Sequence, residues 1–191
     1  MRIAIVTLLG AALASTAAAA ESARPSPKFS ILRAGTPAPA PLELGKYHGK
    51  IVALAFIDTN CSHCQALTAV LKDTAKGYAG RGVQVLECAF NDDAEHLVAG
   101  FIQRFQPNFP VGWNNRAAVM AYLQHNILDP RPLYVPHMVF LDRGGIIRED
   151  VAGEEDFFKD PDAAIRKVLE KLLKPPRSGA PAGTAKKPAG K

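Results

Sequence analysis

Two cysteines three positions apart, Cys61 and Cys64, are the residues of this sequence best suited to chemistry. They follow an apolar run at 51–57 and begin a segment, 61–78, whose apolar residues recur at helical spacing. In the first turn of a helix such positions lie about 5–6 Å apart, within the range that a disulfide requires. Because free backbone N–H groups and the helix dipole stabilise an anion there, we expect Cys61 to be a nucleophilic thiolate. Cys64 is then the thiol that resolves a mixed disulfide.

A structural zinc site is the main alternative for this pair. Zinc needs four ligands, and the sequence contains neither a second C-x-x-C nor an H-x-x-x-H pair. The pattern therefore favours a redox-active Cys61–Cys64 disulfide, which holds two electrons without any dissociable cofactor.

Strand and helix patterns alternate along the middle of the chain. Apolar runs and period-two alternation predict strands at 51–57, 83–90, 109–113, 139–141 and 146–151. Helical spacing predicts helices at about 61–78, 93–105, 116–126 and 155–173, the second of them capped by Asp92 or Asp93. This order predicts a single α/β domain in which a central mixed β-sheet is flanked by helices on both faces.

The amino end has the pattern of an export signal. Arg2 precedes an apolar run, and small residues continue to Ala20 before the first acid, Glu21. We expect a signal peptide at 1–20 that is cleaved, a secreted or periplasmic protein, and no stable membrane insertion afterwards. The alternative is an uncleaved anchor, because residues 3–20 are just long enough to span a thin bilayer.

The flanks of the predicted domain explain the charge of the chain. Residues 21–44 are rich in proline and alanine and predict an extended lead-in to a domain at 45–173. Residues 174–191 hold five basic and no acidic side chains, which predicts a disordered basic tail. The formal net charge is +5, but residues 21–173 carry 17 bases and 18 acids. We therefore do not expect nucleic acid as a partner.

Two segments resemble the thioredoxin-like superfamily. Residues 56–64, FIDTNCSHC, are similar to its active-site segment, and residues 135–145, VPHMVFLDRGG, are similar to its cis-proline strand and hairpin. Gly153 matches the glycine before the last helix, and residues 91–132 are similar to the insert of the exported TlpA/ResA or AhpC/TSA (redoxin)-like branch. The resemblance covers about residues 42–173.

The resemblance implies a thioredoxin-like fold and a thiol–disulfide oxidoreductase. It also implies a cis peptide bond between Val135 and Pro136 that packs against the cysteine pair, with neighbouring backbone free to pair with an extended peptide. The expected partners are protein disulfide or dithiol substrates and a redox protein that recycles the enzyme. We expect the protein to be a monomer.

The residues around the cysteines depart from thioredoxins. Ser62 and His63 replace the usual Gly-Pro, and Asn60 replaces a tryptophan. His63 resembles the histidine of DsbA-type oxidants, in which a cation or dipole beside the thiolate stabilises the reduced form. The direction of electron flow therefore stays open at this point.

A buried acid that thioredoxins carry six residues before the first cysteine is replaced by Ala55. Glu87 is a candidate for the missing proton acceptor of Cys64, and the alternative is an ordinary carboxylate at a strand edge. Cys88 is expected to be a buried, inert thiol, the alternative being a third redox partner.

Two other functions remain as alternatives. Peroxiredoxin-like peroxidases share the fold but need Thr or Ser three residues before the reactive cysteine and Pro seven before it, where this chain has Asp58 and Leu54. A Cu(I)-binding module would use Cys61, Cys64 and His137 as three soft ligands. Otherwise we expect no metal.

Overall fold

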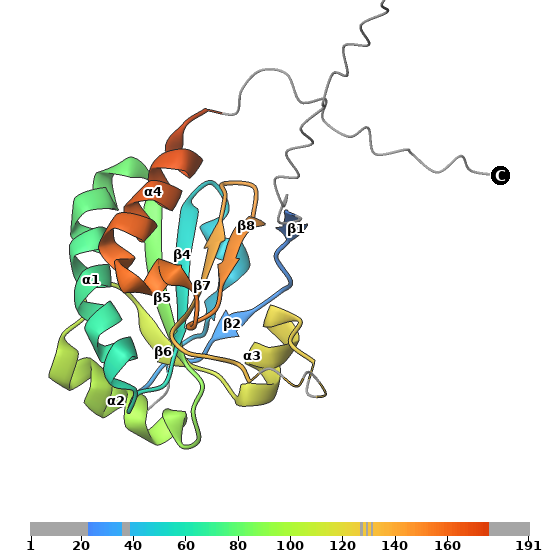
Figure 1. The fold of residues 1–191 in the computed structure, drawn as a ribbon. Coiled ribbons are helices and arrows are strands. Elements are labelled where there is room, and N and C mark those ends of the chain that lie inside the picture. The colour runs from blue at the N-terminus through green and yellow to red at the C-terminus, as the bar shows by residue number, and fades with distance from the viewer. Residues whose placement is uncertain (1–22, 36–38, 127, 129, 131, 176–191) are drawn as a thin grey trace, which may run out of the picture.

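The computed structural model describes residues 23–35, 39–126, 128, 130 and 132–175, which form a central sheet with helices packed on it (Figure 1). Six strands form this sheet in the order β1-β8-β7-β4-β5-β6. The strands are β1 Arg24–Pro25, β4 Ile51–Ile57, β5 Val83–Ala89, β6 Val111–Trp113, β7 His137–Leu141 and β8 Ile146–Val151. The helices are α1 Ser62–Tyr78, α2 Ala94–Phe105, α3 Arg116–Leu123 and α4 Pro161–Leu173. Strands β4, β5 and β6 are parallel, whereas β7, β8 and β1 run antiparallel to their neighbours, so the predicted mixed sheet is confirmed.

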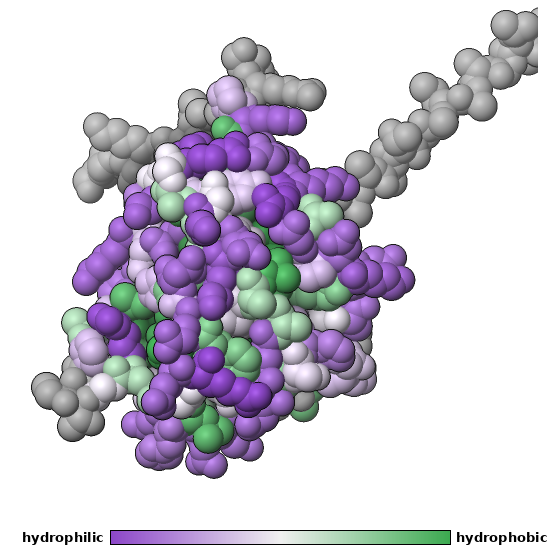
Figure 2. Space-filling model, turned by 90° about the vertical axis from the view of Figure 1, so that its left-hand side faces the viewer, coloured by the Kyte–Doolittle hydropathy of each residue, from purple (hydrophilic) through white to green (hydrophobic). Residues whose placement is uncertain are grey.

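The sheet separates two apolar cores, because helices cover both of its faces (Figure 1). Helices α1, α2 and α4 pack on one face, and α3 packs on the other together with the amino-terminal segment. On the α3 face, the ring of Phe56 lies 5.6 Å from that of Phe29 and 5.5 Å from that of Tyr122. All seven residues of β4 are buried, which explains why this strand is apolar at every position. Outside these cores, hydrophilic side chains dominate the face formed by α1 and α2 (Figure 2).

The predicted lead-in belongs to the domain, so the predicted domain start at residue 45 is too late. Strand β1 pairs with β8, and Leu32 bridges to Trp113 at the far edge of the sheet. Strand β2 (Ser30–Ile31) pairs with β3 (Leu42–Glu43). Within this segment Phe29 and Ile31 are buried, because they complete the core on the α3 face. Their burial stabilises the fold by about 1.5–3 kcal/mol per side chain, which a detached lead-in could not contribute.

The predicted carboxy-terminal helix at 155–173 is divided. A 3-10 turn, η3, spans Asp156–Lys159, and α4 starts anew at Pro161. Proline has no N–H to donate to the preceding turn, so it interrupts a helix but suits the first position of a new one. Asp160 caps that new helix by accepting a hydrogen bond from the Ala163 backbone N–H at 3.2 Å.

Other boundaries and one helix cap also differ from the sequence prediction. Helix α3 ends at Leu123 instead of 126, and β7 begins at His137 instead of 139. Asp93 occupies the capping position of α2, but its φ of 60° is left-handed and its side chain accepts no capping hydrogen bond. The predicted capping by an aspartate side chain is therefore wrong at Asp93.

The predicted signal peptide at 1–20 lies outside the described residues, as do residues 176–191 of the predicted tail. Within the described part of the chain, each helix is too short or too polar to cross a membrane.

Candidate redox site

Cys61 lies where β4 has ended and α1 begins. It is the N-cap residue of α1, with extended backbone angles of −75° and 120°, and it is partly exposed. The backbone N–H of Cys64 donates a hydrogen bond to the Cys61 Sγ at 3.3 Å. Cys64 itself is fully buried one turn into the helix. The structure holds both residues as free thiols, and it gives them the unequal exposure that an attacking and a resolving cysteine require.

Hydrogen bonds from side chains, and not strand pairing, hold the loop before Cys61 in place. Asn91, which follows β5, accepts a hydrogen bond from the Thr59 backbone N–H at 3.0 Å and donates one to the Thr59 hydroxyl at 3.1 Å. Gln65 of α1 donates to the Thr59 carbonyl at 3.0 Å. Asp58 accepts from the Asn60 backbone N–H at 2.7 Å. These contacts attach the reactive turn to two neighbouring elements.

Beneath Cys64, a short chain of polar groups enters the core. The Thr68 hydroxyl lies 3.1 Å from the Cys64 carbonyl oxygen and 3.0 Å from Oε1 of Glu87 on β5. Thr68 and Glu87 are both fully buried, so the prediction of an ordinary strand-edge carboxylate is wrong. Burial raises the pKa of Glu87 to about 8. Burial also raises the pKa of the Cys64 thiol, and the contact with Cys61 raises it further.

The peptide bond between Val135 and Pro136 is cis, in agreement with the resemblance. Both residues line a cavity of about 420 Å³, the cis-proline groove, together with His63 of the cysteine turn. Val70 of α1 and Phe158 of η3 form apolar walls of this groove. The structure therefore brings His63, Val135 and Pro136 together, whereas the predicted packing of Pro136 directly on the cysteine pair stays a prediction.

Gly153 makes the groove possible by its lack of a side chain. A Cβ atom there would lie 2.9 Å from the Val135 carbonyl carbon and 3.0 Å from the Pro136 oxygen. Because real Cβ atoms do not approach backbone so closely, only glycine lets the chain pass behind the cis peptide bond. This contact brings the next residue, Glu154, to the rim of the cis-proline groove.

His137 is turned to a different set of partners. Its Nε2 lies 2.6 Å from Asp150 Oδ1, and Asp150 Oδ2 accepts a hydrogen bond from Arg24 at 2.7 Å. Among the described residues, no group of three His, Cys, Asp or Glu side chains is arranged to hold a metal ion. The structure therefore does not bring Cys61, Cys64 and His137 together as ligands, and the predicted copper site is wrong. Sequence analysis missed Arg24 because its partner Asp150 lies far away along the chain. It also missed Asp150, although the predicted hairpin places this residue on the strand beside His137.

The peroxidase alternative also finds no support in the site. Leu54 is fully buried within β4, and Asp58 is engaged with the backbone of the turn. Cys88 is fully buried, and burial raises the pKa of its thiol, so it has the environment of an inert cysteine.

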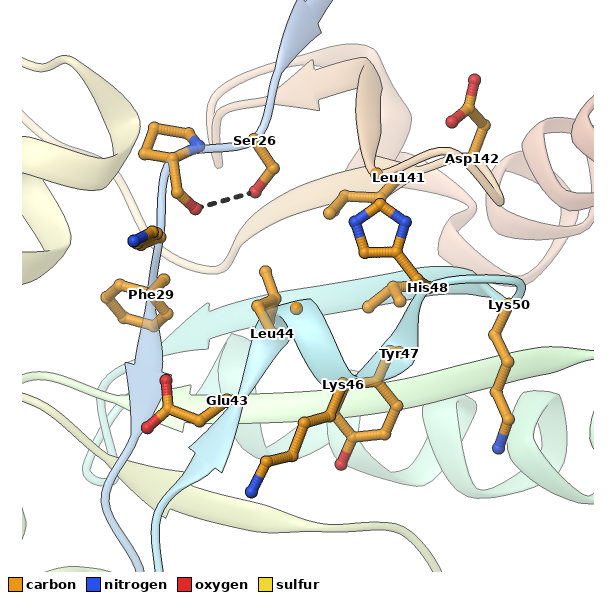
Figure 3. Close-up of a pocket in the computed structure, with 15 residues that line it drawn as sticks. Ser26, Phe29, Glu43, Leu44, Lys46, Tyr47, His48, Lys50, Leu141 and Asp142 are labelled. Carbon is orange, nitrogen blue, oxygen red and sulfur yellow. Dashed lines mark hydrogen bonds between the residues drawn. The ribbon is translucent and has the colours of Figure 1, made fainter.

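A second cavity, of about 500 Å³, lies at the opposite end of β4 (Figure 3). It is lined by residues of the amino-terminal segment, the 3-10 turn η1 (Leu44–Tyr47) and the hairpin between β7 and β8. His48 lies at this hairpin, where its ring would be 3.2 Å from a Cβ atom on Gly145. No cysteine lines this cavity, so it is separate from the redox site.

Comparisons with known proteins agree with this fold. A model of the AhpC/TSA family matches residues 24–150. No curated protein matches the chain in sequence. A thiol:disulfide interchange protein of the thioredoxin family from Chlorobium tepidum TLS is similar in structure, with 19% identity, a TM-score of 0.61, and coverage of 80% of this chain and 97% of that chain. The thioredoxin domain of a thiol-disulfide oxidoreductase from Bacteroides vulgatus has 17% identity and a TM-score of 0.60, and the match covers 78% of this chain and 96% of that chain.

At such identities the structural likeness shows a shared fold, whereas the family match extends over most of the described domain. The chain belongs to the AhpC/TSA family and has a thioredoxin-like fold.

Proposed function

We propose that the protein is an exported thiol–disulfide oxidoreductase that works through the Cys61–Cys64 pair. The observation that carries this proposal is the hydrogen bond from the Cys64 N–H to the Cys61 Sγ at the start of α1. Such a bond favours a thiolate, which is the reactive form of cysteine. The names of the similar structures, which include thiol:disulfide interchange proteins, support the same activity.

The reaction proceeds in two exchanges. The Cys61 thiolate attacks one sulfur of a substrate disulfide, which forms a mixed disulfide and releases the other substrate sulfur as a thiolate. Cys64 then loses its proton and attacks the Cys61 sulfur. This closes the Cys61–Cys64 disulfide and releases the second substrate thiolate. Two electrons pass from the protein dithiol to the substrate, and the reverse sequence oxidises a substrate dithiol.

The Cys61–Cys64 pair itself carries the electrons, so the reaction needs no dissociable cofactor. A second redox protein must restore the starting state of the pair after each turnover. The cis-proline groove is the place for an extended substrate segment, because its apolar walls adjoin the turn that carries His63. We propose that protein substrates bind there, that the protein acts as a monomer, and that it neither binds nucleic acid nor inserts stably into a membrane after signal cleavage.

Single-cysteine variants test the activity. Cys61→Ser should abolish reduction of a small aromatic disulfide, and Cys64→Ser should accumulate mixed disulfides that a reductant releases. Cys88→Ala is the matched control and should keep wild-type activity, because Cys88 is fully buried. Full exchange activity in Cys61→Ser would overturn the proposal.

The reduction potential of the pair decides the direction of electron flow. A value near −270 mV, about that of thioredoxin, indicates a reductase, and one near −120 mV, about that of DsbA, indicates an oxidant. His63 is exposed beside the pair, so His63→Ala should lower the potential if the imidazole stabilises the thiolate.

Export is tested on the full chain expressed in a bacterium with a periplasm. The amino-terminal pattern that ends at Ala20 predicts a periplasmic product that begins at Glu21. Mass spectrometry of the protein from the periplasmic and membrane fractions measures both its location and its first residue. An intact amino end in the membrane fraction would instead indicate the anchor.

A further inference from the structure

The cavity of about 500 Å³ at the opposite end of β4 has no part in the two-cysteine reaction. Three segments enclose it: residues 26–29, residues 43–48 around η1, and residues 141–145 at the β7–β8 hairpin (Figure 3). Cavities of this size hold small organic molecules when apolar walls are combined with a few polar groups. The residues of the cavity therefore indicate which class of molecule it would bind.

Backbone hydrogen bonds join the three segments to one another around the cavity. The Ser26 N–H donates to a carbonyl oxygen of the hairpin at 3.0 Å, and the Leu44 N–H donates to one of the amino-terminal segment at 2.9 Å. The Gly49 N–H, directly after His48, donates to the hairpin at 2.9 Å. Each segment is thus bonded to the other two. The cavity is preformed, so a ligand would not have to order its walls.

The floor of the cavity is apolar. Phe29, Leu44, Val52 and Leu141 line it, and all four are buried members of the core on the α3 face. Because the core holds these side chains in place, the floor offers a fixed apolar surface to the body of a ligand.

Ammonium groups lie around this floor. Lys28, Lys46 and Lys50 line the cavity, and in Figure 3 the Lys46 and Lys50 side chains extend to the same side as the Tyr47 hydroxyl. Burial raises the pKa of this hydroxyl, so it keeps its hydrogen and is able to donate to an oxygen. The ion pairs among the described residues involve other cations, so none of the three lysines is neutralised within this part of the chain.

The two carboxylates that line the cavity have other partners. Glu43 accepts a hydrogen bond from the Ser30 hydroxyl at 2.7 Å. Asp142 accepts hydrogen bonds from two backbone N–H groups of the hairpin at 2.9 and 3.0 Å, and it pairs with Arg148 at 2.7 Å. Although burial opposes ionisation, these contacts hold the pKa of Asp142 below its ordinary value. The lysines are therefore available to an anion that enters the cavity.

We propose that this cavity binds a small amphipathic carboxylate, with its apolar body on the floor and its carboxylate group beside the lysines. Carboxylate oxygens only accept hydrogen bonds, and ammonium and hydroxyl groups donate them. A small inorganic anion would leave the floor in contact with water, and a neutral alcohol would leave the ammonium groups without a charged partner. No cysteine lines the cavity, so the ligand binds without blocking disulfide exchange.

Titration calorimetry with sodium octanoate tests this proposal on the purified protein. We expect octanoate to bind at one site. Binding of 1-octanol, which lacks the charge, should be at least tenfold weaker, and acetate, which lacks the apolar body, should not bind measurably. Octanoate should also raise the melting temperature as its concentration rises. Absence of octanoate binding, or equal binding of octanoate and 1-octanol, would overturn the proposal.

Lysine variants locate the site. Lys46→Gln combined with Lys50→Gln should weaken octanoate binding about tenfold, because two of the cationic partners are lost. Lys76→Gln removes an exposed charge from α1 and is the matched control, which should bind octanoate as the wild type does. Unchanged binding in the double variant, or an equal loss in Lys76→Gln, would contradict the assignment.

Two further measurements exclude other places of binding. Val70→Asp alters the cis-proline groove and should keep octanoate binding, and octanoate should leave the rate of disulfide exchange unchanged. Loss of binding in Val70→Asp, or inhibition of exchange by octanoate, would place the ligand in the groove and overturn the proposal. Attachment to vesicles of anionic phosphatidylglycerol without octanoate binding would overturn it in favour of a membrane surface.

Discussion

The backbone N–H of Cys64 donates to the sulfur of Cys61 over 3.3 Å. A cysteine here takes the place that serine or aspartate occupies at the start of other helices, where a side-chain acceptor satisfies a free N–H group. The contact that begins α1 is thus also the contact that stabilises the nucleophile. The Cys61 sulfur therefore serves both as the cap of α1 and as the nucleophile.

This double role predicts different effects for two substitutions of Cys61. Serine retains an acceptor, so Cys61→Ser should fold with the stability of the reduced wild type although it has no redox activity. Cys61→Ala should lose about 1 kcal/mol of unfolding free energy because the cap is gone. Urea denaturation under reducing conditions measures both. Equal stability of the two variants would show that the sulfur does not cap the helix.

Gly153 should tolerate no side chain. In Gly153→Ala the new Cβ would lie 2.9 Å from the Val135 carbonyl carbon, so the cis-proline segment must shift. We expect a loss of about 1–3 kcal/mol in stability and slower attack on substrate disulfides. Gly100→Ala on α2 is the control, because a Cβ there meets nothing within 4 Å and alanine favours a helix. Similar behaviour of the two variants would contradict the close approach at Gly153.

The buried Glu87 predicts a loss of stability with rising pH. Its pKa is about 8 in the folded protein, against an ordinary value of 4.5. Between these values the folded state holds a proton that the unfolded state has released, so the unfolding free energy falls as pH rises. The loss, on the order of 5 kcal/mol, is complete above about pH 8. Denaturation of wild type and Glu87→Gln across this range should show a difference that grows with pH. A constant difference would place the carboxyl group in contact with water.

Asp150 should contribute stability with the opposite pH dependence. Burial opposes its ionisation, but the hydrogen bond from His137 and the contact with Arg24 together hold its pKa below the ordinary 3.8. Its stabilisation is complete above pH 3.8 and is lost as pH falls through the lowered value. Asp150→Asn should therefore be less stable than wild type near neutral pH, by about 1–3 kcal/mol, and the gap should close in acid. Thermal unfolding at both pH extremes checks this expectation.

The cis-proline groove predicts a distinction between large and small substrates. Val70 lines the groove but is not part of the cysteine turn. Val70→Asp should weaken binding of protein disulfides, raising KM about tenfold or more, because a carboxylate there would be desolvated by an apolar segment. A small aromatic disulfide should react as before. Ala69→Asp, on the exposed side of the same helix, is the control for the added charge. Equal effects of both variants would indicate that substrates bind elsewhere.

The sequence by itself determined the reactive pair and most of the helices and strands between residues 51 and 151. Period and composition are local properties, so the apolar run of β4, the helix after Cys61 and the hairpin after His137 could be predicted from neighbouring residues. The spacing of Cys61 and Cys64 likewise defined their chemistry, because a helical turn brings such positions together without help from the rest of the fold.

Only the tertiary structure decided the partners of the buried polar groups. Glu87 meets Thr68 because α1 packs on β5, and His137 meets Asp150 because the two side chains come from the neighbouring strands β7 and β8. Burial depends on all the elements that cover a residue, and a local pattern does not contain this information. For the same reason the local pattern of residues 21–44 predicts a lead-in outside the domain, whereas Phe29 in this segment completes a core formed by β4 and α3.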